Sequence, residues 1–131
     1  MMHQFSVRVY YEDTDMAGIV YYANYLKYIE RARSDWVREL GIDQGALRDA
    51  GQVFAVARIE ADYVIPARFD DALQVQTRIV RCTGARLVLA QDVCRDGQVV
   101  FAAQVTLVAL DRAGRATRLP AEFRRAAGQT T

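Results

Sequence analysis

The chain has 131 residues, of which 52% are hydrophobic, and its 17 basic and 16 acidic side chains leave a formal net charge of +1. This length predicts one domain, residues 1–131, with enough apolar residues to form a core without disulfide or metal support. The balanced charge excludes the strong basic field of a general nucleic-acid-binding protein.

The first predicted elements are a strand, an acidic loop and a long helix. Alternation of apolar residues from Phe5 to Tyr11 is typical of a half-buried strand. The polar residues 12–15 and the pair Ala17-Gly18 then predict a loop. From Tyr22 to Leu40, apolar residues recur every three or four positions, which indicates a helix of about five turns with one apolar face.

The remaining sequence predicts mainly extended structure. A short helix over residues 43–50 precedes four strands, at residues 53–65, 72–82, 86–94 and 99–110, and a short helix over 121–127 closes the chain. The pair Asp96-Gly97 indicates a tight hairpin. We expect an α+β fold, in which a five-stranded antiparallel sheet carries the long helix on its concave face. Its open edges predict a homo-oligomer formed by pairing of sheet edges.

Cysteine usage and hydropathy indicate a cytoplasmic protein. Cys82 and Cys94 lie in predicted strands without a CxxC spacing, which predicts ordinary packing in a reducing compartment. Residues 1–6 lack the apolar run of a signal peptide. No segment approaches the ~20 apolar residues of a transmembrane helix.

Most common catalytic chemistries lack their residues in this sequence. His3 is the only histidine, and the only serines, Ser6 and Ser34, lie outside any G-x-S-x-G turn. One histidine and two separated cysteines do not suit zinc, and no phosphate-binding glycine loop occurs. We therefore expect no metal and no cofactor, which leaves carboxylates for acid–base chemistry.

Three carboxylates cluster in the predicted loop, at Glu12, Asp13 and Asp15. A calcium loop is excluded because Asn24 stands where a bidentate glutamate is required. A solvated loop beside a helix dipole remains the alternative to a functional site. The loop leads directly into the helix start, whose unpaired N–H groups point outward. A carboxylate beside such donors suits acyl transfer, in which the donors stabilise an oxyanion and the carboxylate attacks or activates water.

The run from Val9 to Leu26, VYYEDTDMAGIVYYANYL, resembles the signature of hotdog-fold acyl-CoA thioesterases. It is similar to the 4-hydroxybenzoyl-CoA thioesterase family, which includes the Tol–Pal-associated, YbgC-like acyl-CoA thioesterases, and the similarity continues through residues 30–33. The resemblance implies a hotdog fold, a five-stranded antiparallel sheet wrapped around one long helix. It also implies hydrolysis of a short-chain or aromatic acyl-CoA to free acid and CoA.

The resemblance implies roles for three residues of the loop and helix start. Asp15 matches the catalytic aspartate, which acts as nucleophile or as general base in different members. The backbone N–H of Tyr22 matches the donor that polarises the thioester carbonyl, and Gly18 lets the loop pass close to the substrate. Tyr22 stands where many Tol–Pal-associated members have histidine, and a tyrosine at this position instead resembles 4-hydroxybenzoyl-CoA thioesterase itself. The choice between aliphatic and aromatic substrates therefore stays open.

Three further residues are candidates for substrate binding. Glu30 matches an acidic position near the far end of the acyl group in aromatic-specific members, and the alternative is an ion pair with Arg33. Arg86 and Arg118 are candidates for the CoA phosphates, and the alternative for each is a solvated surface arginine.

The resemblance also bears on assembly and on a second function. We expect a homotetramer built from dimers, although the sequence does not distinguish a tetramer from a dimer. We expect no nucleic-acid partner. The alternative function is a hotdog module that binds CoA ligands or proteins of the envelope or of lipid synthesis.

Overall fold

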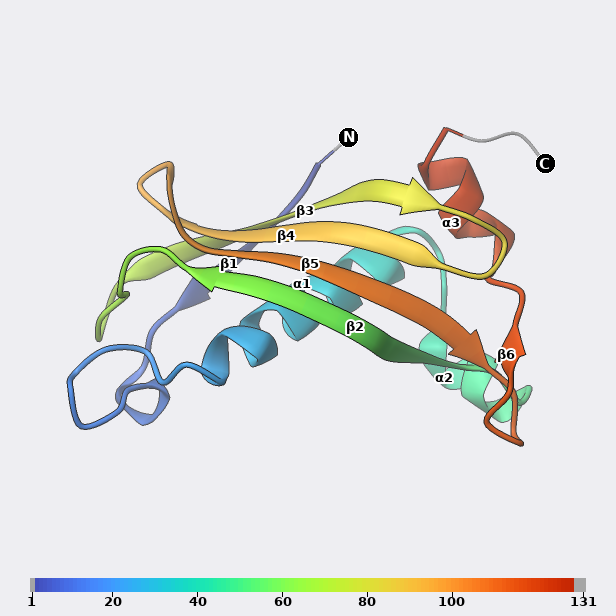
Figure 1. Cartoon of the computed structure of the whole chain (residues 1–131), viewed down its shortest axis with the longest axis horizontal. Coiled ribbons are helices and arrows are strands. Elements are labelled where there is room, and N and C mark those ends of the chain that lie inside the picture. The colour runs from blue at the N-terminus through green and yellow to red at the C-terminus, as the bar shows by residue number, and fades with distance from the viewer. Residues whose placement is uncertain (1, 129–131) are drawn as a thin grey trace.

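The computed structural model describes residues 2–128, in which one curved antiparallel sheet lies against one long helix (Figure 1). The strand order is β1-β3-β4-β5-β2, and a short strand, β6, pairs with β5. All pairings are antiparallel. The strands are β1 (His3–Arg8), β2 (Val53–Tyr63), β3 (Ala72–Cys82), β4 (Leu87–Arg95), β5 (Gln98–Leu110) and β6 (Ala116–Thr117). The five long strands confirm the predicted sheet, and β6 adds a sixth of two residues.

The turns and irregularities of the sheet have local causes. Asp96 and Gly97 have φ angles of 51° and 79°, so they form the two-residue turn that their sequence predicts between β4 and β5. The β3–β4 turn closes through the Thr83 N–H, which donates to the Arg86 carbonyl at 2.8 Å. Register shifts interrupt the β2–β5, β3–β4 and β4–β5 pairings. Such shifts bend strands, which helps the sheet to curve around the helix.

Helix α1 (Asn24–Glu39) lies along the concave face of the sheet and supplies one side of the core (Figure 1). It begins two residues later than its apolar periodicity predicts and is followed by Gly41, which has a φ of 85°. Each large apolar side chain that is fully buried here stabilises the fold by about 1.5–3 kcal/mol. The buried side of the helix consists of Asn24, Tyr25, Tyr28, Ile29, Ala32, Trp36 and Val37.

A buried amide joins the middle of α1 to the sheet. Gln91 of β4 is fully buried, and its Nε2 donates to the Ile29 carbonyl at 2.9 Å and to Thr77 Oγ1 at 3.0 Å. Its Oε1 accepts from Arg33 Nη1 at 3.0 Å. The side chain thus makes three hydrogen bonds, which offsets the desolvation of a polar group in the core.

Two short helices lie near the end of the sheet where α1 terminates. Helix α2 (Gln44–Asp49) begins at Asp43, whose carboxylate accepts the Ala46 N–H at 3.0 Å. Helix α3 (Ala121–Ala126) buries Phe123 against Trp36, with ring centroids 5.6 Å apart. Among residues 2–128, no helix is long and apolar enough to cross a bilayer.

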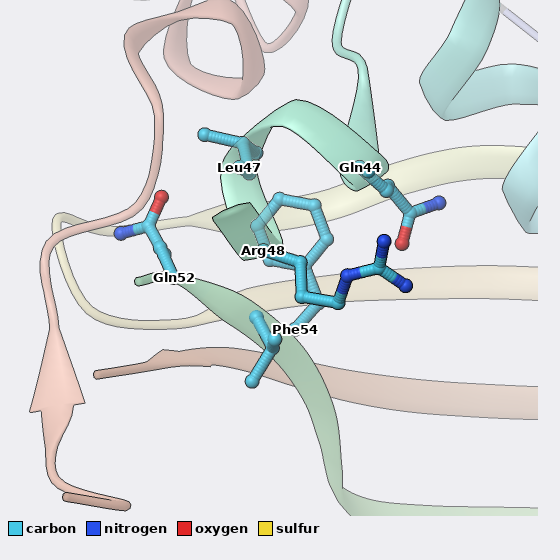
Figure 2. A pocket seen from close by; sticks show the side chains of 7 residues that line it. Gln44, Leu47, Arg48, Gln52 and Phe54 are labelled. Carbon is cyan, nitrogen blue, oxygen red and sulfur yellow. The ribbon is translucent and has the colours of Figure 1, made fainter. Parts of the chain in front are cut away.

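A groove of about 250 Å³ lies between α2 and the start of β2 (Figure 2). It is partly polar and partly apolar, and its lining includes Gln44, Leu47, Arg48, Gln52 and Phe54.

Candidate active site

The chain between β1 and α1 forms a compact loop with Asp13 at its centre. The prediction that β1 extends to Tyr11 is wrong, because the strand ends at Arg8 and a short 3-10 turn, η1 (Tyr11–Asp13), follows. The Asp13 carboxylate causes this turn by accepting the Tyr10 N–H at 2.8 Å. The Asp13 N–H donates to the Tyr10 carbonyl at 3.0 Å. Asp13 therefore organises the loop backbone.

Asp15 lies in a small hairpin that follows this turn. Thr14 and Val20 pair as an isolated antiparallel bridge, and the Asp15 N–H donates to the Ile19 carbonyl at 2.9 Å. The Gly18 N–H donates to the Asp15 carbonyl at 3.0 Å, and Gly18 has a φ of 77°, a region that favours glycine. The backbone thus holds Asp15 firmly at the start of the turn.

The Asp15 side chain is half-buried, and only one of its two carboxylate oxygens accepts a hydrogen bond within the described residues. Its Oδ1 accepts the Ala17 N–H at 2.9 Å. Its Oδ2 has no hydrogen-bond partner among residues 2–128. A carboxylate that is fixed through one oxygen leaves the other oxygen for a water or an electrophilic carbon.

The segment before α1 presents two free backbone donors. The Asp13 carbonyl accepts the Tyr21 N–H at 2.8 Å and Asn24 Nδ2 at 3.0 Å, and the Asn24 N–H donates to the Tyr21 carbonyl at 2.8 Å. Within the described part of the chain, the N–H groups of Tyr22 and Ala23 have no acceptor. They lie just before the first turn of α1, where the helix dipole favours a developing negative charge.

Five aromatic side chains pack against one another at this segment and form what we call the aromatic cluster: Tyr21, Tyr22, Tyr25, Tyr63 and Phe101. The centroids of Tyr21 and Tyr22 lie 4.9 Å apart, and Tyr25 stacks on Phe101 at 4.6 Å. Burial raises the pKa of the Tyr25 phenol, although the Ala67 N–H that it accepts works in the opposite direction. The Tyr22 side chain is 61% exposed, so the cluster presents an open aromatic surface beside the free N–H groups.

The segment between β2 and β3 supports the Asp15 hairpin from behind. The Val20 N–H donates to the Ala67 carbonyl at 2.8 Å, and Ile19 pairs with Arg68 as a bridge. An ion pair closes this segment, since Arg95 Nη1 lies 2.6 Å from Asp71 Oδ2.

The Asp71 carboxylate also accepts the Arg68 N–H at 2.8 Å. Burial by itself would raise the pKa of Asp71. The Arg68 N–H and the Arg95 guanidinium outweigh burial and hold the pKa below its usual value. Asp71 is therefore charged at neutral pH and fixes the segment on which the hairpin rests.

The remaining candidate residues lie away from Asp15. Glu30 is exposed on α1, and its carboxylate accepts the Ser34 hydroxyl at 2.7 Å. Because Arg33 turns to Gln91, the ion pair between Glu30 and Arg33 that was the alternative does not form. Whether Glu30 lies near the acyl group stays a prediction.

Arg86 and Arg118 come together at the β3–β4 turn. Both are exposed, and the Arg118 guanidinium lies over Gly84 of this turn, next to the Leu119 N–H that donates to the Gly84 carbonyl at 2.9 Å. The β3–β4 turn follows the last residue of β3, whereas the Asp15 hairpin lies near the first residue of β3. Eleven extended residues separate the two ends by roughly 35 Å. In one chain, these arginines are therefore remote from Asp15.

His3, the only histidine, is engaged elsewhere. Its Nε2 lies 2.9 Å from Asp35 Oδ2 and 3.5 Å from Glu39 Oε2, in the C-terminal half of α1. It ties the edge strand β1 to the helix and is more than three helical turns from Tyr22, so it does not belong to this site.

Several supporting residues of the site were missing from the sequence-based prediction. Asn24 lies within the motif that resembles the thioesterase signature, so its amide was a possible signal. Tyr63, Ala67 and Asp71 carry no local signal, because they reach the loop only through contacts across more than 40 residues of sequence.

Comparisons with known proteins agree with this fold. The model of the thioesterase-like superfamily matches residues 9–127. The acyl-CoA thioesterase YbgC of Haemophilus influenzae is 39% identical over 108 residues, which cover 82% of this chain and 79% of that protein. A solved structure of a probable thioesterase from Bartonella henselae has a TM-score of 0.88 at 34% identity and covers 92% of this chain and 100% of its own.

A second similar structure was solved with an acyl-CoA bound. It is 4-hydroxybenzoyl-CoA thioesterase, as an aspartate-to-asparagine variant in complex with 4-hydroxybenzoyl-CoA, with a TM-score of 0.87 at 25% identity over 95% of this chain and 97% of that one. The chain belongs to the thioesterase-like superfamily. It has the hotdog fold that its sequence predicts and is a thioester hydrolase.

Proposed function

We propose that this thioester hydrolase cleaves an acyl-CoA to a free acid and CoA, with Asp15 and the Tyr22 N–H as its reacting groups. One observation carries the proposal. A single small loop holds both the Asp15 carboxylate, which has one oxygen without a hydrogen bond, and the Tyr22 N–H, which has no acceptor among the described residues. The Asp15 N–H donates to the Ile19 carbonyl and the Tyr21 N–H donates to the Asp13 carbonyl, on either side of the Thr14–Val20 bridge, and these two bonds hold the reacting groups on neighbouring strands of that loop.

The chemistry follows from the roles of these groups. The Tyr22 N–H donates to the thioester oxygen, where negative charge develops, and removal of one such donor costs about 2.7–4 kcal/mol in comparable sites. Asp15 either attacks the carbonyl carbon or removes a proton from the attacking water, and a general base contributes roughly a factor of 10²–10⁴. The carbon–sulfur bond then breaks, and CoA leaves as the thiolate and takes up a proton. If water attacks, the acyl group leaves directly as the free acid. If Asp15 attacks, the acyl group stays on Asp15 as an anhydride, which water then hydrolyses to the free acid.

The relatives support this assignment by their names. The Haemophilus influenzae protein is named an acyl-CoA thioesterase, and 4-hydroxybenzoyl-CoA thioesterase has been solved with an aspartate replaced by asparagine and its acyl-CoA bound. We extend the acyl-CoA substrate to this chain because its Asp15 loop carries the thioesterase signature from Val9 to Leu26.

The site is open in one chain, and we propose that a second copy completes it. Strand β2 is an edge strand with an unpaired side, and it exposes Val56, Ile59 and Tyr63. Antiparallel pairing of two β2 strands centred on Ile59 sets each Arg58 opposite Glu60 of the other copy. Antiparallel pairing places the end of one sheet that carries Asp15 beside the end of the other sheet that carries the β3–β4 turn. Arg86 and Arg118 of the partner subunit then lie at the same end as Asp15.

Substrate class and assembly follow from the same proposal. The exposed Tyr22 ring and the aromatic cluster favour a compact acyl group, either aromatic or short-chain, next to the free N–H groups. A tetramer built from two such dimers, a cytoplasmic location and an envelope or lipid-synthesis partner stay predictions from the sequence.

A thiol-release assay tests the function. Purified protein is incubated with short-chain, long-chain and aromatic acyl-CoAs, and free CoA is measured. Release from a short-chain or aromatic member well above the buffer rate supports the proposal. If no member releases CoA above the buffer rate, the alternative of a CoA-binding module replaces it.

A further inference from the structure

Tyr63 connects the end of β2 with the peptide group next to the Tyr22 donor. Its hydroxyl donates to the Tyr22 carbonyl oxygen at 2.8 Å, across 41 positions of sequence. Its ring packs against Phe101 and Tyr22, with centroid distances of 5.0 and 6.4 Å. A side chain of the sheet thus holds the backbone just before helix α1.

The hydrogen bond acts on a rigid peptide unit. The Tyr22 carbonyl and the Ala23 N–H share one planar peptide, so a donor on the oxygen also sets the direction of the N–H. The Asn24 N–H holds the preceding peptide in the same way, through the Tyr21 carbonyl at 2.8 Å. With both peptide oxygens held, the two soft dihedral angles of Tyr22 are fixed, and with them the direction of its own N–H.

The Tyr63 hydroxyl is suited to this task at neutral pH and above. Burial raises the pKa of its phenol, and the neighbouring Tyr22 raises the pKa further, so the group stays protonated and donates. A donor on the carbonyl also polarises the peptide, which strengthens the Ala23 N–H as a donor.

We propose that Tyr63 is a positioning residue, whose hydroxyl aims the N–H groups of Tyr22 and Ala23 at the thioester oxygen. The proposal rests on the function proposed above. Tyr63 touches no reacting atom and acts through the Tyr22 backbone. The competing explanation is that Tyr63 serves only as packing for the aromatic cluster, a role that its ring alone would fill.

The substitution Tyr63→Phe separates the two explanations, because it keeps the ring and removes the hydroxyl. We expect kcat to fall about tenfold or more, since small misplacements at a reacting centre are costly, while KM stays within about twofold. The ¹H–¹⁵N signals of Tyr22 and Ala23 should shift, whereas the midpoint of urea unfolding should change little.

Tyr11→Phe is the matched control. Tyr11 is 82% exposed and its hydroxyl has no hydrogen bond among the described residues, so kcat and both amide signals should match the wild type. A Tyr63→Phe variant with wild-type kcat, or with unmoved Tyr22 and Ala23 signals, overturns the positioning role. If the wild type itself releases no CoA, the proposed function fails. The amide signals then still decide whether Tyr63 positions the donors.

Discussion

The Ala67 carbonyl accepts the Val20 N–H at 2.8 Å and so joins the segment before β3 to the hairpin that carries Asp15. The Ala67 N–H in turn donates to the Tyr25 hydroxyl at 3.3 Å, which links the same segment to α1. One short stretch of chain therefore fixes both sides of the site. Its own rigidity comes from the ion pair between Asp71 and Arg95 at 2.6 Å.

Replacement of Asp71 should weaken this segment in a pH-dependent way. Asp71→Asn removes a partly buried ion pair and should lower the free energy of unfolding by about 1–2 kcal/mol at neutral pH. Because the folded-state pKa is lowered, the contribution of Asp71 is full above its unfolded value of about 4 and is lost as pH falls through the folded value. Urea unfolding at pH 7 and pH 3 should show a smaller difference between variant and wild type at pH 3.

Asp70→Asn is the control for Asp71. Asp70 pairs with Arg8 on the surface, where both side chains are more than half exposed. Its loss should change stability by less than about 1 kcal/mol. Equal effects of the two substitutions at both pH values would contradict the role given to Asp71.

Gly18 offers a separate test of the hairpin. Gly18→Ala must hold a positive φ, which should lower stability by about 1–2 kcal/mol, and the strained turn should displace Asp15 and reduce kcat. Gly114→Ala is a close match, since Gly114 has a φ of 78° and, like Gly18, open space around an added Cβ. It lies in the β5–β6 turn, away from Asp15. The two variants should show similar decreases in the free energy of unfolding, and only Gly18→Ala should have a lower kcat. Similar kcat values for both would argue against a role for the hairpin.

The sequence predicted the local parts of this structure well. The Asp96-Gly97 turn follows from two residues that tolerate positive φ, and β3 spans residues 72–82 as predicted. The start of α1 was placed two residues early. Tyr22 fits the apolar periodicity of the helix, but the bonds of Tyr21 and Asn24 to the Asp13 carbonyl hold this stretch as a turn.

The site was predictable only in its local part. Asp15, Gly18 and Tyr22 belong to one continuous motif, and the structure brings them into one loop. The bond from Tyr63 to Tyr22 depends on how β2 ends over the helix start, which no periodicity encodes. The distance of Arg86 from Asp15 likewise emerges only from the direction of β3.

Asn24 should matter for activity more than its distance from the chemistry suggests. Asn24→Ala removes the Nδ2 bond to the Asp13 carbonyl at 3.0 Å, so stability should fall by about 1 kcal/mol and the loop before α1 should loosen. We expect a lower kcat in the thiol-release assay. Asp111→Ala, which removes two bonds to backbone N–H groups in the β5–β6 turn, is the control for stability loss without loss of kcat. Unchanged kcat in Asn24→Ala would count against this account of the loop.

Arg86 and Arg118 should affect binding of CoA and leave the chemical step unchanged. Arg86→Ala or Arg118→Ala should raise KM for an acyl-CoA up to about fivefold, because an exposed ion pair contributes up to about 1 kcal/mol. The effect should shrink at high salt. It should also vanish for an acyl-pantetheine, which lacks the nucleotide. Arg38→Ala on the exposed side of α1 should leave KM unchanged. A KM increase that persists with acyl-pantetheine would contradict the assignment to the phosphates.

The rate of CoA release by Asp15→Asn tests the central claim most directly. Asparagine keeps an oxygen that can accept the Ala17 N–H, so the hairpin should stay folded, with a circular dichroism spectrum and unfolding midpoint close to those of the wild type. Loss of the carboxylate should lower kcat at least about a hundredfold. Glu12→Gln, an exposed neighbour in the same loop, should retain wild-type kcat. A folded Asp15→Asn variant with near-normal turnover would show that Asp15 does not deliver the attack.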